Sequence, residues 1–321
     1  GQPGTIVTVP KPIGNQEIEV TRSFADGSSS TDKLTARRSG NLQFPVDVGQ
    51  TIRIRNLNTG DEICSNNPVQ ANLVTGDRNS DFEMRWYSLL PKDQFASDYF
   101  TPVTRRGSDN SNGAASVYLY NPGPSDITVV ETLANGQPRN HVVAGGKSVL
   151  VGLNENQDKD SGHRFKSNDG SPFFGLVLVD TEKNIRGSGG NKYYDDRKGL
   201  VVDWGVPLQP TESLTAKAII GLGYACTLGP RLTQNQNVCF DVFKHPSSSI
   251  QSSPVWVAAL EAAQYLVDYN CDGSVDKRIP RSGTNPELKS VIITDAQDQD
   301  MSGACITAED AIGKPVKFAA V

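Results

Sequence analysis

Short runs in which apolar and polar side chains alternate recur along most of the chain. A period of two with many β-branched residues is typical of β-strands that have one buried face. Residues 121–124 (Asn-Pro-Gly-Pro) and the pair Asn135-Gly136 are strong turn signals between such runs. The pattern therefore predicts many short strands joined by hairpins and loops. The clearest runs are 51–57, 116–122, 126–133, 140–153, 173–180 and 289–295.

Residues 254–270 fit two different patterns. They are rich in Ala, Leu and Glu, which favour a helix, but from Val255 onward apolar and other side chains alternate as in a strand. We expect strand, turn and strand, with the turn near Glu261 and Ala262. Elsewhere the clearest site for a helical turn is 91–99.

An order of features occurs twice and indicates repeated modules. In each copy, an apolar strand that begins with Pro precedes a Trp, a Leu-x-Pro step and a Ser-containing segment leading into another strand. The copies cover 66–122 and 170–260. Such spacing is typical of successive modules that each bury a small core. We expect an all-β chain of tandem β-sandwich-like modules with short strands and long loops. The predicted bounds are 1–110, 111–213 and 214–321.

A third copy begins at 254–260 and ends at 314–321, with no Trp-containing strand after it. Two explanations stay open: the chain is a fragment of a longer protein, or a strand from elsewhere completes the last module. The N-terminal strand at 5–9 has no obvious hairpin partner. Strand donation between subunits, in which a peptide fills an open sheet edge, is therefore one hypothesis.

Composition narrows the class of protein only a little. No apolar run approaches the roughly 18 residues of a membrane span, so we expect a soluble chain without a transmembrane segment. The chain begins at Gly1 without a signal-peptide core, as a processed secreted chain would. The net charge is −5, from 31 basic and 36 acidic residues. No basic stripe is interleaved with aromatic residues, so nucleic acid is not an expected partner.

The five cysteines favour disulfides over zinc, because none lies in a C-x-x-C pair or at zinc-ligand spacing from a His. Cys226 and Cys239 flank a polar stretch that a disulfide could close. Cys271 and Cys305 each lie beside an acidic loop, which makes a second bridge plausible. Cys64 would then have no cysteine to pair with. The alternative is that all five are reduced and buried.

The sharpest local motif is D-x-N-x-D-G-x-x-D at 268–276. It brings oxygen ligands round one point at alternate positions, and its Gly permits a sharp turn, which suits Ca²⁺. An EF-hand would have Glu where Ile279 stands, so the acidic cluster 295–300 is the natural source of further ligands, particularly if Cys271 pairs with Cys305. A solvated polar turn is the alternative. The predicted Ca²⁺ ligands are Asp268, Asn270, Asp272, Ser274, Asp276, Asp295, Asp298 and Asp300.

Catalytic signatures are not found, and we expect no enzyme. There is no G-x-S-x-G elbow, no H-E-x-x-H and no dinucleotide-binding G-x-G-x-x-G in a suitable context. His141, His163 and His245 stand in unrelated contexts, and we expect His163 at the surface. A second acidic loop, 155–160, has no Gly at the bend and is interpreted as a solvated turn.

Several aromatic residues on predicted strands raise the alternative of carbohydrate binding. They are Trp86, Tyr118, Tyr120 and Trp204. Core packing is the more common role for aromatic side chains in strands, and we expect it here. A carbohydrate-active enzyme or carbohydrate-binding module would instead need an exposed aromatic cleft with convergent carboxylates.

Seven of these segments, taken in order, resemble the large secreted bacterial proteins that have an IgGFc-binding-protein-like N-terminal region. They are 64–77, 85–103, 117–129, 202–210, 253–260, 267–276 and 294–306. The resemblance spreads over about residues 45–320 and implies an extracellular, β-rich, non-catalytic surface or matrix component. It does not extend to antibody binding, because nothing in the sequence identifies such a site.

These observations predict a secreted, extracellular or cell-surface structural protein. It would be a surface-layer, matrix or fibre subunit that self-associates, with Ca²⁺ stiffening the third module. The alternative is an adhesin or carbohydrate-binding protein that recognises a glycan or protein ligand of a host or matrix.

Overall fold

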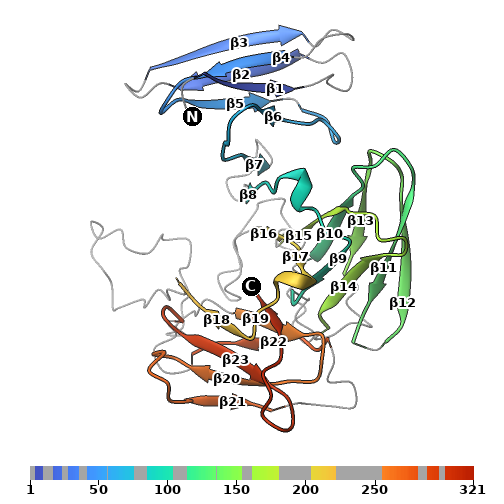
Figure 1. The fold of residues 1–321 in the computed structure, drawn as a ribbon, viewed down its shortest axis with the longest axis vertical. Coiled ribbons are helices and arrows are strands. Elements are labelled where there is room, and N and C mark those ends of the chain that lie inside the picture. Colours follow the sequence, from blue (N-terminus) through green and yellow to red (C-terminus); the bar gives the residue numbers. More distant parts are fainter. Residues whose placement is uncertain are drawn as a thin grey trace, which may run out of the picture.

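The chain consists of small antiparallel β-sheets arranged in three successive groups (Figure 1). The computed structural model describes residues 4–9, 17–23, 28–35, 42–55, 57–75, 85–103, 114–134, 136–153, 161–180, 204–221, 255–280, 288–295 and 301–321. The helical elements in these ranges are two 3-10 turns, Lys92–Gln94 and Thr211–Ser213. No helix in the same ranges is long and apolar enough to cross a membrane. The predicted all-β fold of β-sandwich-like modules is confirmed.

The first sandwich packs two three-stranded sheets against each other. One sheet has the order β4-β1-β6, from strands Leu42–Val46, Thr5–Val9 and Cys64–Ser65. The other has the order β3-β2-β5, from strands Ser29–Thr35, Glu17–Ser23 and Thr51–Arg55. Val9 and Phe44 of one sheet and Val20 of the other meet in the core, where they are fully buried.

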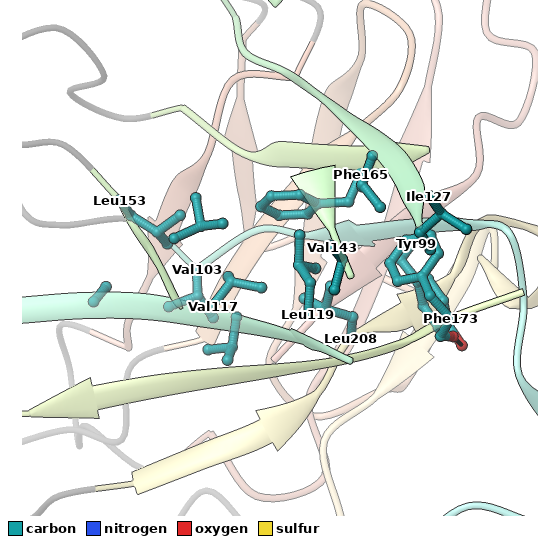
Figure 2. Packing of buried hydrophobic residues seen from close by; sticks show 14 residues of the cluster. Tyr99, Val103, Val117, Leu119, Ile127, Val143, Leu153, Phe165, Phe173 and Leu208 are labelled. Atoms are coloured by element: carbon teal, nitrogen blue, oxygen red, sulfur yellow. Dashed lines mark hydrogen bonds between the residues drawn. The ribbon is translucent and has the colours of Figure 1, made fainter. Parts of the chain in front are cut away.

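The second sandwich has larger sheets and the largest core (Figure 2). One sheet has the order β13-β10-β15-β16, from Ser148–Gly152, Ala114–Tyr120, Phe174–Asp180 and Trp204–Pro207. The other has the order β12-β11-β14-β9-β17, from Pro138–Val143, Ile127–Thr132, His163–Ser167, Asp98–Thr101 and Gln209–Pro210. Leu119, Val129 and Phe165 interdigitate between the sheets, and Tyr99 packs edge-to-face on Phe173 with ring centroids 4.9 Å apart.

The third sandwich repeats this plan with shorter strands. One sheet has the order β22-β19-β24, from Val291–Ile293, Val255–Ala259 and Phe318–Ala320. The other has the order β18-β23-β20-β21, from Lys217–Ile219, Cys305–Glu309, Gln264–Asp268 and Lys277–Ile279. Val257, Tyr265 and Phe318 lie at the centre of its core. The predicted strand, turn and strand over 254–270 is confirmed by β19 and β20.

The three sandwiches share one strand order. The strands of each sandwich can be numbered from a first strand, which is β1, β10 or β19. In each sandwich this first strand lies between the fourth and the sixth strand of that count. The next strand, β2, β11 or β20, lies between the third and fifth. In the second and third sandwiches an additional opening strand, β9 or β18, pairs with the fifth strand of this count, β14 or β23. The chain is thus a tandem array of topologically equivalent units.

The linkers between sandwiches are also equivalent. A strand hairpin, β7 (Asn72–Thr75) with β8 (Arg85–Ser88), leads through Pro91 and a 3-10 turn into β9. The β15–β16 ladder leads through Pro210 and a 3-10 turn into β18. Pro91 and Pro210 have nearly the same backbone, with φ of −57° and −55° and ψ of 145° and 136°. The Leu-x-Pro step is therefore the structural repeat.

The pairing differs from the sequence-based expectation at three places. β9 falls inside the predicted first module, 1–110, but pairs with β14. The N-terminal strand β1 pairs with both β4 and β6, so it has partners within its own chain. The run 140–153 is two strands, β12 and β13, because a turn with Gly146 at φ 66° separates them.

The second and third sandwiches meet across a tight junction. Phe100 of the second packs with Ala258, Leu288 and Ala319 of the third in one buried cluster. Gly162 donates its backbone N–H to the Leu288 carbonyl, and a Cβ at Gly162 would lie 2.9 Å from the Phe100 ring. Only Gly fits where the backbones approach so closely.

Candidate functional site

The acidic motif forms the loop between β20 and β21, as its turn residues require. Cys271 and Gly273 have positive φ of 54° and 95°, so the chain reverses sharply within the motif. A non-Gly residue with positive φ is uncommon, and Cys271 is held there by its disulfide and the local hydrogen bonds. Val267 pairs with Lys277 on the two flanking strands, which closes the loop at its base.

The loop carboxylates are oriented by the backbone of the loop itself. Asp268 accepts hydrogen bonds from the Asp272 N–H at Oδ1 (3.1 Å) and from the Gly273 N–H at Oδ2 (2.8 Å). Asp276 Oδ2 accepts from the Tyr269 N–H at 2.8 Å. These contacts turn the first and last acids of the motif toward the loop interior. Oxygen atoms placed in this way are the donor type that a hard cation such as Ca²⁺ requires.

One residue of the predicted second acidic segment, Asp295, lies near the loop. The predicted Cys271–Cys305 disulfide is present, with Cα atoms 5.0 Å apart, and it ties the loop to β23. The Tyr269 hydroxyl donates to the Thr294 carbonyl at 3.0 Å. Burial raises the pKa of Tyr269, and the negative charges of Asp295 and Asp276 raise it further. Asp295, which is 6% exposed, thus contributes charge to the same locality.

The other predicted ligands are only partly placed. Asn270, Asp272 and Ser274 are exposed on the loop, whereas Asp298 and Asp300 lie outside the described residues. In the part of the chain that the structure describes, no three His, Cys, Asp or Glu side chains form a metal-binding group. The loop fits Ca²⁺ by donor chemistry and turn geometry, and the site stays a prediction.

The remaining cysteines divide into two cases. Cys64 on β6 is exposed and has a free thiol, in agreement with its expected place outside the two bridges. Cys226 and Cys239 lie outside the described residues.

Sequence analysis missed a buried charged cluster in the second sandwich. Glu131 of β11 is fully buried and accepts hydrogen bonds from His141 of β12 and His163 of β14, each at 2.8 Å. Arg139 Nη1 lies 3.9 Å from Glu131 Oε2. Burial alone would raise the pKa of Glu131, but the two histidine hydrogen bonds hold it at about 2. The carboxylate is therefore ionised and connects three adjacent strands.

The expectation that His163 lies at the surface is wrong, because its side chain is fully buried. The contexts of His141 and His163 are also related, since both bond the same carboxylate. Alternation could have revealed this: Glu131 continues the inward row of Ile127 and Val129. A Glu in an apolar row needs charged or donor partners inside the core. The geometry is that of a structural network, in which imidazoles satisfy one buried carboxylate.

The expectation that the strand aromatics pack in the core is wrong for Trp86 and Tyr118. Trp86 is 66% exposed on β8, and Tyr118 is 39% exposed on the outer face of β10. Tyr120 is half-buried, and the side chain of Trp204 lies outside the described part. A shallow hollow of about 260 Å³ lies near the second linker turn. It is lined by Phe95, Ala96, Ser97, Asp98, Gly170, Pro172, Thr211 and Glu212.

Comparison with known proteins returns no match to any family model, curated protein or solved structure. The resemblance to IgGFc-binding-protein-like bacterial surface proteins therefore stays a prediction.

Proposed function

We propose that the chain is a non-catalytic extracellular structural protein, a subunit of a surface layer, matrix or fibre. The observation that carries the proposal is the linker between the second and third sandwiches. The same segment pairs through β16 with β15 of the second sandwich and through β18 with β23 of the third. The second sandwich is therefore hydrogen-bonded into the start of the third, an arrangement suited to transmitting force along a chain.

The junction beside this linker supports a load-bearing role. Ser290 donates its hydroxyl hydrogen bond to the Pro102 carbonyl, and Ser161 bridges to Lys289 between the same sandwiches. Together with the Phe100–Ala258 contact, these interactions fix the angle between the two units.

Ca²⁺ is the proposed structural cofactor of the third sandwich. The acids of the 268–276 loop and Asp295 would repel one another, and Tyr269 already responds to the charges of Asp276 and Asp295. The residues proposed to hold the ion are Asp268, Asn270, Asp272, Ser274, Asp276 and Asp295, with Asp298 and Asp300. A divalent cation would neutralise this charge and stiffen the far end of the sandwich.

We also place the protein outside the cell. The Cys271–Cys305 disulfide supports this, because disulfides persist mainly in oxidising compartments. The proposed mode of assembly is strand donation, in which one subunit supplies a strand to an open sheet edge of another. β1 is not the donor in this arrangement, because it is already paired with β4 and β6.

Sedimentation velocity of the purified chain tests the proposal. We expect species larger than the 34.6 kDa monomer to grow with protein concentration and to be favoured by millimolar Ca²⁺. A single monomeric boundary across two decades of concentration, with and without Ca²⁺, would reject self-association.

An adhesin or carbohydrate-binding protein is the second candidate, and Trp86 is the observation that favours it. Its indole is exposed on a two-stranded ribbon beside the Ser88–Asn72 hydrogen bond (3.2 Å), so an apolar ring and polar groups lie on one surface. Binding of soluble glycans that Trp86→Ala abolishes, in a protein that stays monomeric, would favour this candidate over the structural one.

A further inference from the structure

Among the strands that the structure describes, the fifth strand of the first sandwich ends its sheet, whereas the fifth strand of each of the other two sandwiches has a further partner. In the second sandwich β14 pairs with β11 and with the opening strand β9. In the third, β23 pairs with β20 and with β18. In the first, β5 pairs with β2 and is the last strand of its sheet among the strands that the structure describes. An unpaired edge is a template for another strand.

In the second and third sandwiches, the strand that pairs with the fifth strand precedes the sandwich's other strands in the chain. β9 and β18 both follow a linker that leaves the preceding hairpin or sandwich through a proline and a 3-10 turn. Filling the edge with a delivered strand is thus how this chain already joins one unit to the next. The same interface would continue to a further unit if β5 received such a strand.

Charge on the outer face of β5 matches an incoming strand of the β9 type. In the second sandwich, Arg164 on β14 bonds the Asp98 carboxylate of β9 through Nε (2.9 Å) and Nη2. In the first sandwich, Ile52 and Ile54 of β5 pack toward the core, which directs Arg53 outward. Arg53 is exposed, whereas its neighbour Arg55 bonds Glu19 on β2 at 3.3 Å.

We propose that β5 accepts a strand from a second copy of this chain, and that Arg53 binds the acidic residue of that strand as Arg164 binds Asp98. The incoming strand is antiparallel, as β9 is to β14, and carries an acid followed by aromatic or apolar residues. The inference rests on the proposed self-assembly and adds to it the receiving edge and the residue that selects the donor.

A peptide of residues 94–103, which contains β9, is the probe for this edge. Labelled peptide should bind the wild-type chain in a fluorescence anisotropy titration. Arg53→Glu should weaken the binding at least about threefold, since exposed ion pairs contribute up to about 1 kcal/mol and the swap adds repulsion. Arg278→Glu on β21, also an exposed strand arginine, is the matched control and should leave the binding unchanged.

Two further probes separate strand pairing from charge alone. A peptide with Asp98→Lys should bind Arg53→Glu better than it binds the wild type. A peptide with Tyr99→Pro should bind neither protein, because proline removes a donor from the ladder. Equal binding of all peptides to all proteins, or no binding of the probe to the wild-type chain, would overturn the inference.

Sedimentation of the full chain distinguishes the inference from the function on which it rests. Association that Arg53→Glu weakens and Arg278→Glu does not would support both. Association that Arg53→Glu leaves unchanged would overturn the role of β5 but keep the structural function. Absence of association in the wild-type chain would overturn the proposed self-assembly, and the peptide titration would then decide the edge on its own.

Discussion

His163 donates a hydrogen bond from Nδ1 to Oε1 of Glu131 over 2.8 Å, with both side chains fully buried in the second sandwich. His141 completes the pair of donors from the neighbouring strand. The three residues join β11, β12 and β14 through one buried polar network, which adds to the apolar packing that sets their relative positions.

Glu131→Gln should lower the free energy of unfolding by about 1–3 kcal/mol at pH 7, because buried donors lose a charged acceptor. The pKa of Glu131 is about 2 in the folded protein and 4.5 ordinarily. The stabilisation is therefore complete above about pH 4.5 and is lost as the pH falls toward 2. Urea unfolding at several pH values measures this, with Glu261→Gln, an exposed change, as control. Equal acid sensitivity of the wild type and Glu131→Gln would contradict it.

Gly162→Ala should loosen the junction between the second and third sandwiches. The added Cβ would lie 2.9 Å from Phe100 Cζ and 3.0 Å from the Leu288 carbonyl oxygen, so the backbones must separate. We expect a cost of about 1–3 kcal/mol and faster hydrogen exchange of the residue-162 N–H, which donates to the Leu288 carbonyl across the junction. Gly152→Ala is the matched control, since its Cβ would meet nothing within 4 Å. A junction equally protected in both variants would show that the close approach is unimportant.

Loss of the Cys271–Cys305 bridge should destabilise the third sandwich. The cysteines are 34 residues apart, and closing a loop of that size stabilises a fold by roughly 3–4 kcal/mol in the chain-entropy account. Cys271→Ala with Cys305→Ala should lower the midpoint of thermal unfolding, whereas Cys64→Ser, at an exposed thiol, should leave it unchanged. The prediction fails if reducing agent has no effect on the wild-type midpoint.

Asp268→Asn should weaken Ca²⁺ binding and remove its stabilising effect on the third sandwich. The change removes one negative charge from the ligand set, and it keeps one of the two oxygens that accept hydrogen bonds from the Asp272 and Gly273 N–H groups. Calorimetric titration measures the affinity. Asp169→Asn, in an exposed turn of the second sandwich, is the control and should bind as the wild type does. No heat of binding in the wild-type chain would reject the site.

Alternation and turn residues were sufficient to predict most strands and the all-β class. The neighbours of Val255 and Val257 have a propensity for helix, but the alternation of these two valines predicted a strand. The alternation was the better guide, because a sheet buries alternate positions whatever the intrinsic preference of the residues. The Cys271–Cys305 bridge was one of the alternatives that the sequence offered, and the structure contains it. The signal for it was local, because each of the two cysteines lies beside an acidic segment of the sequence.

Long-range relationships were beyond the same reasoning. The partners of β1 are a strand more than thirty residues away and a two-residue strand, and neither leaves a hairpin signal in the sequence. Trp86 alternates correctly for a buried strand residue, but its ribbon has only one covered face, and Tyr87 occupies that face. The histidine partners of Glu131 come from two other strands, so the buried cluster is a long-range relationship that the sequence analysis did not identify.

Electron microscopy of the purified chain, first with Ca²⁺ and then with excess chelator, tests the central claim most directly. The proposed function predicts filaments or ordered assemblies with Ca²⁺, which fray when the chelator removes the ion from the third sandwich. Monodisperse single particles under both conditions would contradict self-assembly and would favour an adhesin or glycan-binding protein instead.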